Sequence, residues 1–274
     1  MGYNRQRINM KKYFAILSAI IVLAFYGCTK PAGNPITRTF SLEGAYEKLE
    51  VSNAFDVFVS DTASQIYVTV GENIMPKVVV EKKGNTLKIY IKPRVNFVNF
   101  VNSQMTVILP YCADLKDVDL SGASTMHTPF ALEGEDVEVS LSGASSYYGN
   151  VVAGKISLDL SGSSKFYGDI ESDFLSLELS GASDVEMVGE TNTLKIDLSG
   201  ASNIIRQMVE SRYALECDQC EGSMSGASSA YIHCNNSIRV ELSGASELHY
   251  TGDATTEGCS MSGGSTISRD GRGN

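Results

Sequence analysis

The sequence is dominated by short segments in which hydrophobic and polar positions alternate and then give way to small residues. Leu194, Ile196 and Leu198 alternate with charged residues and are followed directly by Ser-Gly-Ala-Ser. Alternation with a period of two is typical of a β-strand with one buried face. The pentapeptide Leu-Ser-Gly-Ala-Ser, or a close variant of it, occurs eight times, starting at Leu120, Leu141, Leu160, Leu179, Leu198, Met224, Leu242 and Met261.

The pentapeptides are nearly evenly spaced. Five of the seven intervals are 18 or 19 residues long, and the other two are 21 and 26. Turn-forming residues such as those at 168–173 separate the apolar segments and leave no room for a helix. An apolar residue also recurs six positions after the start of each copy, at Met126, Tyr147, Phe166, Val185, Ile204, Ala230, Leu248 and Ile267. We therefore predict an all-β parallel solenoid, in which each coil of about 19 residues stacks about 4.8 Å from the last.

The small residues of the pentapeptide fit a corner of such a coil. Glycine permits a sharp bend, and alanine and serine fit where equivalent positions lie directly above one another. We expect the serines to form hydrogen-bonded ladders along the solenoid axis. Eight equivalent serines indicate architecture more than a row of catalytic nucleophiles.

Residues 37–118 lack the pentapeptide but keep the strand pattern. They predict the start of the same β structure, and turn residues at Gly84-Asn85 leave an antiparallel hairpin as an open alternative. Residues 119–268 then form the repeat region, and residues 269–274 form a short tail.

The first residues predict an export signal. Residues 1–27 contain four basic residues and then an uncharged apolar run, Tyr13–Tyr26, which is too short to span a bilayer. Gly27 precedes Cys28, which is typical of a bacterial lipoprotein signal with Cys28 as the acylated residue. Several acyl chains would hold the protein at a membrane. Residues 28–36 would be the lipidated cysteine and a proline-containing tether.

The net charge restricts the partners. The chain has 22 basic and 32 acidic residues, for a net charge of −10, and loss of the four basic residues in the signal gives −14. A nucleic-acid partner is therefore disfavoured, because binding would require neutralisation of phosphates.

Four stretches together resemble one known family. They are residues 46–57, residues 84–89, residues 107–110 and the first pentapeptide at 120–124. In this order they are similar to the head GIN domain family of auto-transporter adhesins in Bacteroidota, over about residues 40–268. The resemblance implies a right-handed β-helix and a location in the cell envelope. With the lipoprotein signal, we expect the chain to be lipid-anchored at the outer membrane, on its periplasmic face or at the cell surface. It implies no catalytic residue, and we expect no cofactor.

Two of the cysteines predict a disulfide. Cys217 lies seven residues before its pentapeptide and Cys234 eight before the next, so stacking would bring them together in adjacent coils. Cys220 and Cys259 occupy positions at which other coils carry aliphatic residues, which favours buried thiols. Zinc is disfavoured, because the three histidines share no ligand spacing with the cysteines.

Stacking also predicts a row of carboxylates. Asp159, Glu178 and Asp197 each lie one residue before a pentapeptide, in three consecutive coils and on the outward side. This row predicts a solvated acidic face, or alternatively a site for Ca²⁺ or a glycan.

Two classes of function remain. The first is a lipid-anchored envelope protein that binds a glycan, matrix or partner protein through its side wall without catalysis. The alternative is a carbohydrate-active enzyme, a polysaccharide lyase or hydrolase, since β-helices carry both. Most coils are too short to build a catalytic cleft, which favours binding. The longest interval adds residues near 207–213, either a recognition loop or a tolerated insertion.

Overall fold

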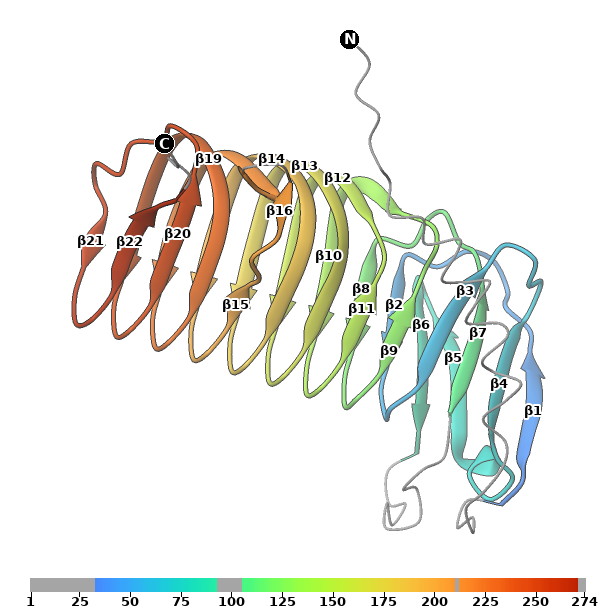
Figure 1. The fold of residues 1–274 in the computed structure, drawn as a ribbon. Coiled ribbons are helices and arrows are strands. Elements are labelled where there is room, and N and C mark those ends of the chain that lie inside the picture. The colour runs from blue at the N-terminus through green and yellow to red at the C-terminus, as the bar shows by residue number, and fades with distance from the viewer. Residues whose placement is uncertain (1–32, 93–104, 210–211, 271–274) are drawn as a thin grey trace.

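The computed structural model describes residues 33–92, 105–209 and 212–270, and Figure 1 shows the strands stacked along one axis. These residues are almost entirely β-structure, with one short 3-10 helix, η1 (Met75–Lys77). No helix in the described ranges is long and apolar enough to cross a bilayer. The predicted signal and Cys28 lie outside the described residues.

Each coil contributes one strand before the pentapeptide and one after it, and these strands stack into two walls. The longest strands, β13 (Lys165–Leu179), β14 (Asp184–Leu198) and β19 (Ser229–Leu242), begin in the second wall and end in the first. The other strands of the first wall are β6 (Thr86–Ile91), β2 (Lys48–Val51), β8 (Asp117–Leu120), β10 (Leu132–Leu141), β12 (Val151–Leu160), β18 (Leu215–Met224) and β21 (Ser260–Met261). Those of the second wall are β7 (Thr106–Pro110), β3 (Asp56–Ser60), β9 (Thr125–His127), β11 (Ser146–Tyr148), β15 (Asn203–Ile204), β20 (Glu247–Thr251) and β22 (Thr266–Arg269).

The register confirms the predicted solenoid. The first residues of successive pentapeptides are Cα partners in parallel strands, from Leu120 through to Met261. The chain therefore forms a parallel β-solenoid of about eight turns.

The N-terminal end combines both arrangements left open by the sequence. Strand β5 (Val78–Lys83) pairs antiparallel with β6 across Gly84-Asn85, and β4 (Ile66–Gly71) pairs antiparallel with both β7 and β1 (Pro35–Phe40). In contrast, β6 and β7 are parallel to β2 and β3. Figure 1 shows the antiparallel strands gathered at this end of the solenoid.

The spatial order of the first coils differs from their order in the chain. Strands β2 and β3 lie between β6–β7 on one side and β8–β9 on the other. Register places Val51-Ser-Asn-Ala-Phe55 directly beside the pentapeptide at Leu120, so this segment is a ninth, divergent copy. Asn53 occupies the glycine position with φ of 79°, a left-handed conformation that asparagine tolerates. Its side-chain Oδ1 accepts a hydrogen bond of 2.9 Å from the Ile91 amide.

The inward-facing side chains form one continuous apolar core. The first residue of the pentapeptide is buried in every repeat except the last, where Met261 is exposed. Phe166 and Tyr147 are fully buried and stack with ring centroids 5.3 Å apart. Stacked aliphatic and aromatic positions thus supply the hydrophobic stabilisation of the solenoid.

The serines do not form the predicted ladder along the axis. The hydroxyl of the last serine in each pentapeptide instead donates to the carbonyl oxygen of the first serine in the same copy, at 2.7–3.1 Å. Backbone groups make the axial ladder, as where the Ala182 amide donates to the Gly162 carbonyl at 2.7 Å. The buried serine therefore closes its own corner, because its short side chain reaches a carbonyl three residues back.

Candidate functional site

The predicted row of carboxylates exists. Asp159, Glu178 and Asp197 are Cα partners in consecutive coils. Lys195 Nζ lies 3.3 Å from Asp197 Oδ2, and Ser223 donates to Asp197 Oδ1 at 2.9 Å. In the described part of the chain, no three His, Cys, Asp or Glu side chains are grouped so as to hold a metal ion. Calcium binding by this row stays a prediction, which calcium titration by calorimetry would test.

A larger acidic feature lies where the chain bends from the second wall into the first. Here a groove of about 420 Å³ crosses the coils that contain β12, β13, β14, β18 and β19. Among the described residues, its polar lining consists of Glu171, Asp173, Glu190, Glu216, Asp218, Ser172, Thr191, Asn192 and Asn235, with no lysine, arginine or histidine. We call it the acidic groove.

Stacking positions the acidic groove. Glu171, Glu190 and Glu216 are successive Cα partners, so one carboxylate recurs in each coil at the strand spacing of about 4.8 Å. Each lies eight residues before the start of a pentapeptide, and the neighbouring column at Asp173 and Asp218 lies six before. The repeat spacing therefore identifies the acidic columns at these two positions as well as the column directly before the pentapeptide, but it does not show that they line a groove.

Amide side chains hydrogen-bond three of the five carboxylates of the groove. Asn192 Nδ2 donates to Asp173 Oδ1 at 2.9 Å, and Asn235 Nδ2 donates to Asp218 Oδ1 at 3.3 Å and to Glu216 Oε1 at 3.4 Å. These bonds connect neighbouring coils. The groove therefore presents oriented hydrogen-bond acceptors without a cationic side chain in its lining.

A ladder of aromatic rings covers part of the outer face of the second wall. Phe58, His127, Tyr148 and Tyr167 stack in sequence, with centroids 4.7–5.0 Å apart and ring planes within 10° of parallel. Burial lowers the pKa of His127, which keeps this ring neutral at pH 7. Because the rings stack face to face along the axis, they stiffen this wall.

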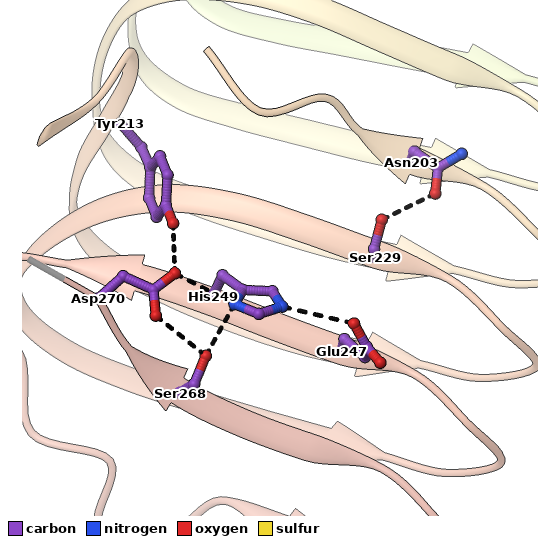
Figure 2. Close-up of polar contacts among 7 residues, drawn as sticks. All are labelled: Asn203, Tyr213, Ser229, Glu247, His249, Ser268 and Asp270. Atoms are coloured by element: carbon purple, nitrogen blue, oxygen red, sulfur yellow. Dashed lines mark hydrogen bonds and ion pairs between the residues drawn. The ribbon is translucent and has the colours of Figure 1, made fainter. Parts of the chain in front are cut away.

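The longest interval forms a hairpin that packs back onto the solenoid. Its strands β16 (Met208–Val209) and β17 (Arg212–Tyr213) pair antiparallel. The Tyr213 amide donates to Thr251 Oγ1 at 3.1 Å, and the Tyr213 hydroxyl donates to Asp270 (Figure 2). The insertion thus spans several coils.

Asp270 belongs to a polar cluster with His249, Ser268 and Glu247 (Figure 2). Ser268 Oγ lies 2.8 Å and Asp270 Oδ2 3.2 Å from His249 Nδ1, and Glu247 Oε2 lies 3.4 Å from Nε2. Burial alone would raise the pKa of Asp270. The hydrogen bond from Tyr213 and the contact with His249 outweigh this effect and lower the pKa.

The residue types in this cluster are those of a hydrolytic triad, but their arrangement is different. In a triad the nucleophile and the carboxylate bond opposite nitrogens of the histidine. Here Ser268 and Asp270 share Nδ1, and the carboxylate near Nε2, from Glu247, is 55% exposed. The arrangement supports attachment of the hairpin through Tyr213.

The two predicted cysteine partners meet. Cys217 and Cys234 are Cα partners in β18 and β19, and both are buried. The hydrogen bond to Cys234, together with burial, raises the pKa of the Cys217 thiol. Cys220 is fully buried and Cys259 is half-buried, so the predicted burial of these thiols is complete for the first and partial for the second.

The stacked coils make this chain a β-solenoid. Its polar groove has the features of a binding site, and its serine–histidine cluster lacks the geometry of a catalytic triad. The family described as "Putative auto-transporter adhesin, head GIN domain" matches residues 45–254. The chain therefore belongs to the head GIN domain family, which confirms the resemblance seen in the sequence. No curated protein matches the chain.

Solved structures share the fold. A "putative adhesin" from Parabacteroides merdae is 17% identical with a TM-score of 0.76, and the match covers 88% of this chain and 98% of that one. A "putative lipid binding protein" from Parabacteroides distasonis is 22% identical with a TM-score of 0.70, covering 87% and 97%. A "putative adhesin" from Bacteroides fragilis is 20% identical with a TM-score of 0.55, covering 89% and 100%.

Proposed function

We propose that this chain is a cell-envelope protein, anchored through a lipid on Cys28, that binds a glycan in the acidic groove without catalysing its cleavage. The observation that carries the proposal is the groove itself, in which fixed carboxylates and amides recur from coil to coil. The family description, an adhesin, supports a binding role at the envelope.

The chemistry of the groove favours an extended, amine-bearing glycan. Carboxylate and amide oxygens accept hydrogen bonds from sugar hydroxyls and amines, and the amide nitrogens donate. The lining carries five acidic residues and no basic one, so a uronic-acid polymer would be repelled and an amino-sugar polymer attracted. Because the acceptors recur along the axis, a ligand with repeating units can use several coils at once.

Binding is favoured over cleavage by the short coils, most of which span 18–21 residues and leave little chain to build a catalytic cleft. A hydrolase would place an acid and a second carboxylate on either side of one glycosidic bond. Reducing-sugar release from a polysaccharide panel would overturn the non-catalytic proposal.

The groove is tested by neutralising its charge. We expect the double variant Glu171→Gln with Asp218→Asn to bind a β-1,4-linked glucosamine hexasaccharide at least about tenfold more weakly in calorimetry, since charge-assisted hydrogen bonds contribute about 1.5–3 kcal/mol each. The N-acetylated hexasaccharide should bind the unmodified protein less tightly, because it lacks the positive charge.

The carboxylate row supplies a matched control. Asp159→Asn with Glu178→Gln removes the same charge from a different column. Unchanged affinity in this variant is expected. Equal loss in both double variants would show a nonspecific charge effect and contradict the assignment of the groove.

The anchor is tested at Cys28. We expect Cys28→Ala to abolish incorporation of radiolabelled fatty acid and to release the protein from the membrane fraction, because the acyl chains are the proposed membrane attachment. Cys112→Ser is the control and should leave fatty-acid incorporation and membrane attachment unchanged. Fatty-acid labelling that persists in Cys28→Ala would refute the assignment.

A further inference from the structure

Two buried thiols face each other beneath one end of the acidic groove. Cys217 is 1% exposed and Cys234 is 0% exposed, and they are Cα partners in adjacent parallel strands. Neighbouring strands lie about 4.8 Å apart, within the range of about 4.4–6.8 Å that disulfides span between Cα atoms. The spacing of adjacent coils therefore fits a disulfide between these two residues.

The other described cysteines are placed differently. The register partner of Cys220 is Ile238, whose carbonyl accepts from the Cys259 thiol at 3.2 Å. The Cys112 thiol donates to the Tyr46 carbonyl, also at 3.2 Å. Among the cysteines of the described ranges, Cys217 and Cys234 alone are partners in strand register.

The pair lies at an irregular point of the groove. The register between β18 and β19 shifts between Cys217 and Gln219, so the strands are locally bulged beside the thiols. The Cys234 thiol also contacts the Asp218 carbonyl at 3.5 Å. Asp218 and Asn235, each adjacent to one of these cysteines, line the groove and bond one another. Any constraint on the two thiols is therefore transmitted directly to groove residues.

We propose that Cys217 and Cys234 are a disulfide site, and that the bond holds the β18–β19 end of the acidic groove in its binding conformation. Formation of the disulfide is independent of the proposed function, whereas the effect of the disulfide on ligand binding rests on the proposed function. A covalent bond across a bulge restricts local opening, which otherwise reduces the fraction of molecules competent to bind.

The oxidant is a thiol–disulfide donor such as oxidised glutathione. The Cys234 thiol loses its proton to solvent, and its thiolate attacks one sulfur of the donor disulfide. This attack forms a mixed disulfide between Cys234 and that sulfur and releases the other donor sulfur as a thiolate, which takes up a proton. Cys217 loses its proton to solvent, attacks the Cys234 sulfur and releases the second donor thiol. Two protein thiols are oxidised and one donor disulfide is reduced to two thiols. Because both cysteines are buried in the folded chain, the reaction takes place as β19 pairs with β18 during folding.

The bond is tested without any ligand. The protein is refolded with oxidised glutathione, denatured, and titrated for free thiols before and after reduction. We expect two fewer free thiols before reduction, and a peptide pair that joins Cys217 to Cys234 after digestion with trypsin, Asp-N and chymotrypsin, because no tryptic site separates the two cysteines. The double variant Cys217→Ser with Cys234→Ser should give the same number of free thiols before and after reduction. Cys112→Ser should still gain two free thiols on reduction. A full complement of free thiols, or a bond between other cysteines, would overturn the proposal.

The effect on the groove has two readouts. Reduction should accelerate amide hydrogen exchange at residues 216–218 and 235 at least about tenfold, and should not alter exchange near Glu171. Reduction should also weaken binding of the glucosamine hexasaccharide in the unmodified protein but not in the double cysteine variant. If the bond forms and slows exchange while no hexasaccharide binds, the glycan assignment fails and the disulfide stands. Unchanged exchange on reduction would refute the structural role of the bond.

Discussion

Replacement of Gly181 by alanine is expected to lower the free energy of unfolding by about 2–5 kcal/mol. Gly181 has φ of +75°, and a Cβ atom built on it would lie 2.4 Å from the carbonyl oxygen of Gly162 in the preceding coil. The left-handed conformation alone costs an alanine about 1–2 kcal/mol, and overpacking typically adds about 1–3 kcal/mol. Neither coil can shift to relieve the contact, because the same corner recurs on both sides. Urea denaturation followed by circular dichroism measures the loss.

Gly84 provides the matched control for this prediction. It also has a left-handed φ, +58°, but a Cβ atom there would meet nothing within 4 Å. Gly84→Ala should therefore cost only about 1–2 kcal/mol, the conformational part. If both substitutions cost the same, the stacked corners are not tightly packed, and the interpretation of the pentapeptide as a stacking motif is wrong.

Replacement of Phe166 by alanine is expected to cost about 3–5 kcal/mol of the free energy of unfolding. Phe166 is fully buried inside the solenoid and stacks on Tyr147, so its removal leaves a cavity that the adjacent coils can only partly close. The same urea denaturation applies, with hydrogen exchange to locate the weakened coils.

Tyr148 is the control for position in the wall. Its ring stacks equally closely, at 4.7 Å, on both His127 and Tyr167, but it lies half-buried on the outer face. Tyr148→Ala should cost about 1 kcal/mol, because much of the side chain is already exposed to water. A larger loss at Tyr148 than at Phe166 would mean that the outer ladder contributes more to stability than the core.

The repeats made most of the fold predictable from sequence. At the corners of the eight pentapeptides, glycine provides both the left-handed φ and the close approach of the next coil, so the periodicity of Ser-Gly-Ala-Ser directly reports the coil length. The copy at residues 51–55 escaped detection because asparagine replaces glycine and Phe55 replaces serine. Its placement between two later coils depends on long-range pairing that no local pattern encodes.

The candidate site was less predictable for a different reason. The parity of a strand identifies outward positions such as Glu178, but it does not show where the wall bends. The acidic groove arises at that bend, at Glu171 and Asp173, where alternation between inward and outward positions is lost. The polar cluster around His249 depends on Tyr213 from the inserted hairpin, whose path the repeat spacing does not determine.

The coil formed by β2 and β3 is flanked on both sides by strands that follow it in the chain, β6–β7 on one side and β8–β9 on the other. We therefore expect this coil to act as an internal template from which folding proceeds in two directions. One direction is short and ends at β1, β4 and β5, and the other adds one coil at a time toward β22. Residues through His127 must be available before the template is covered on both sides, and each later coil then needs only the one before it.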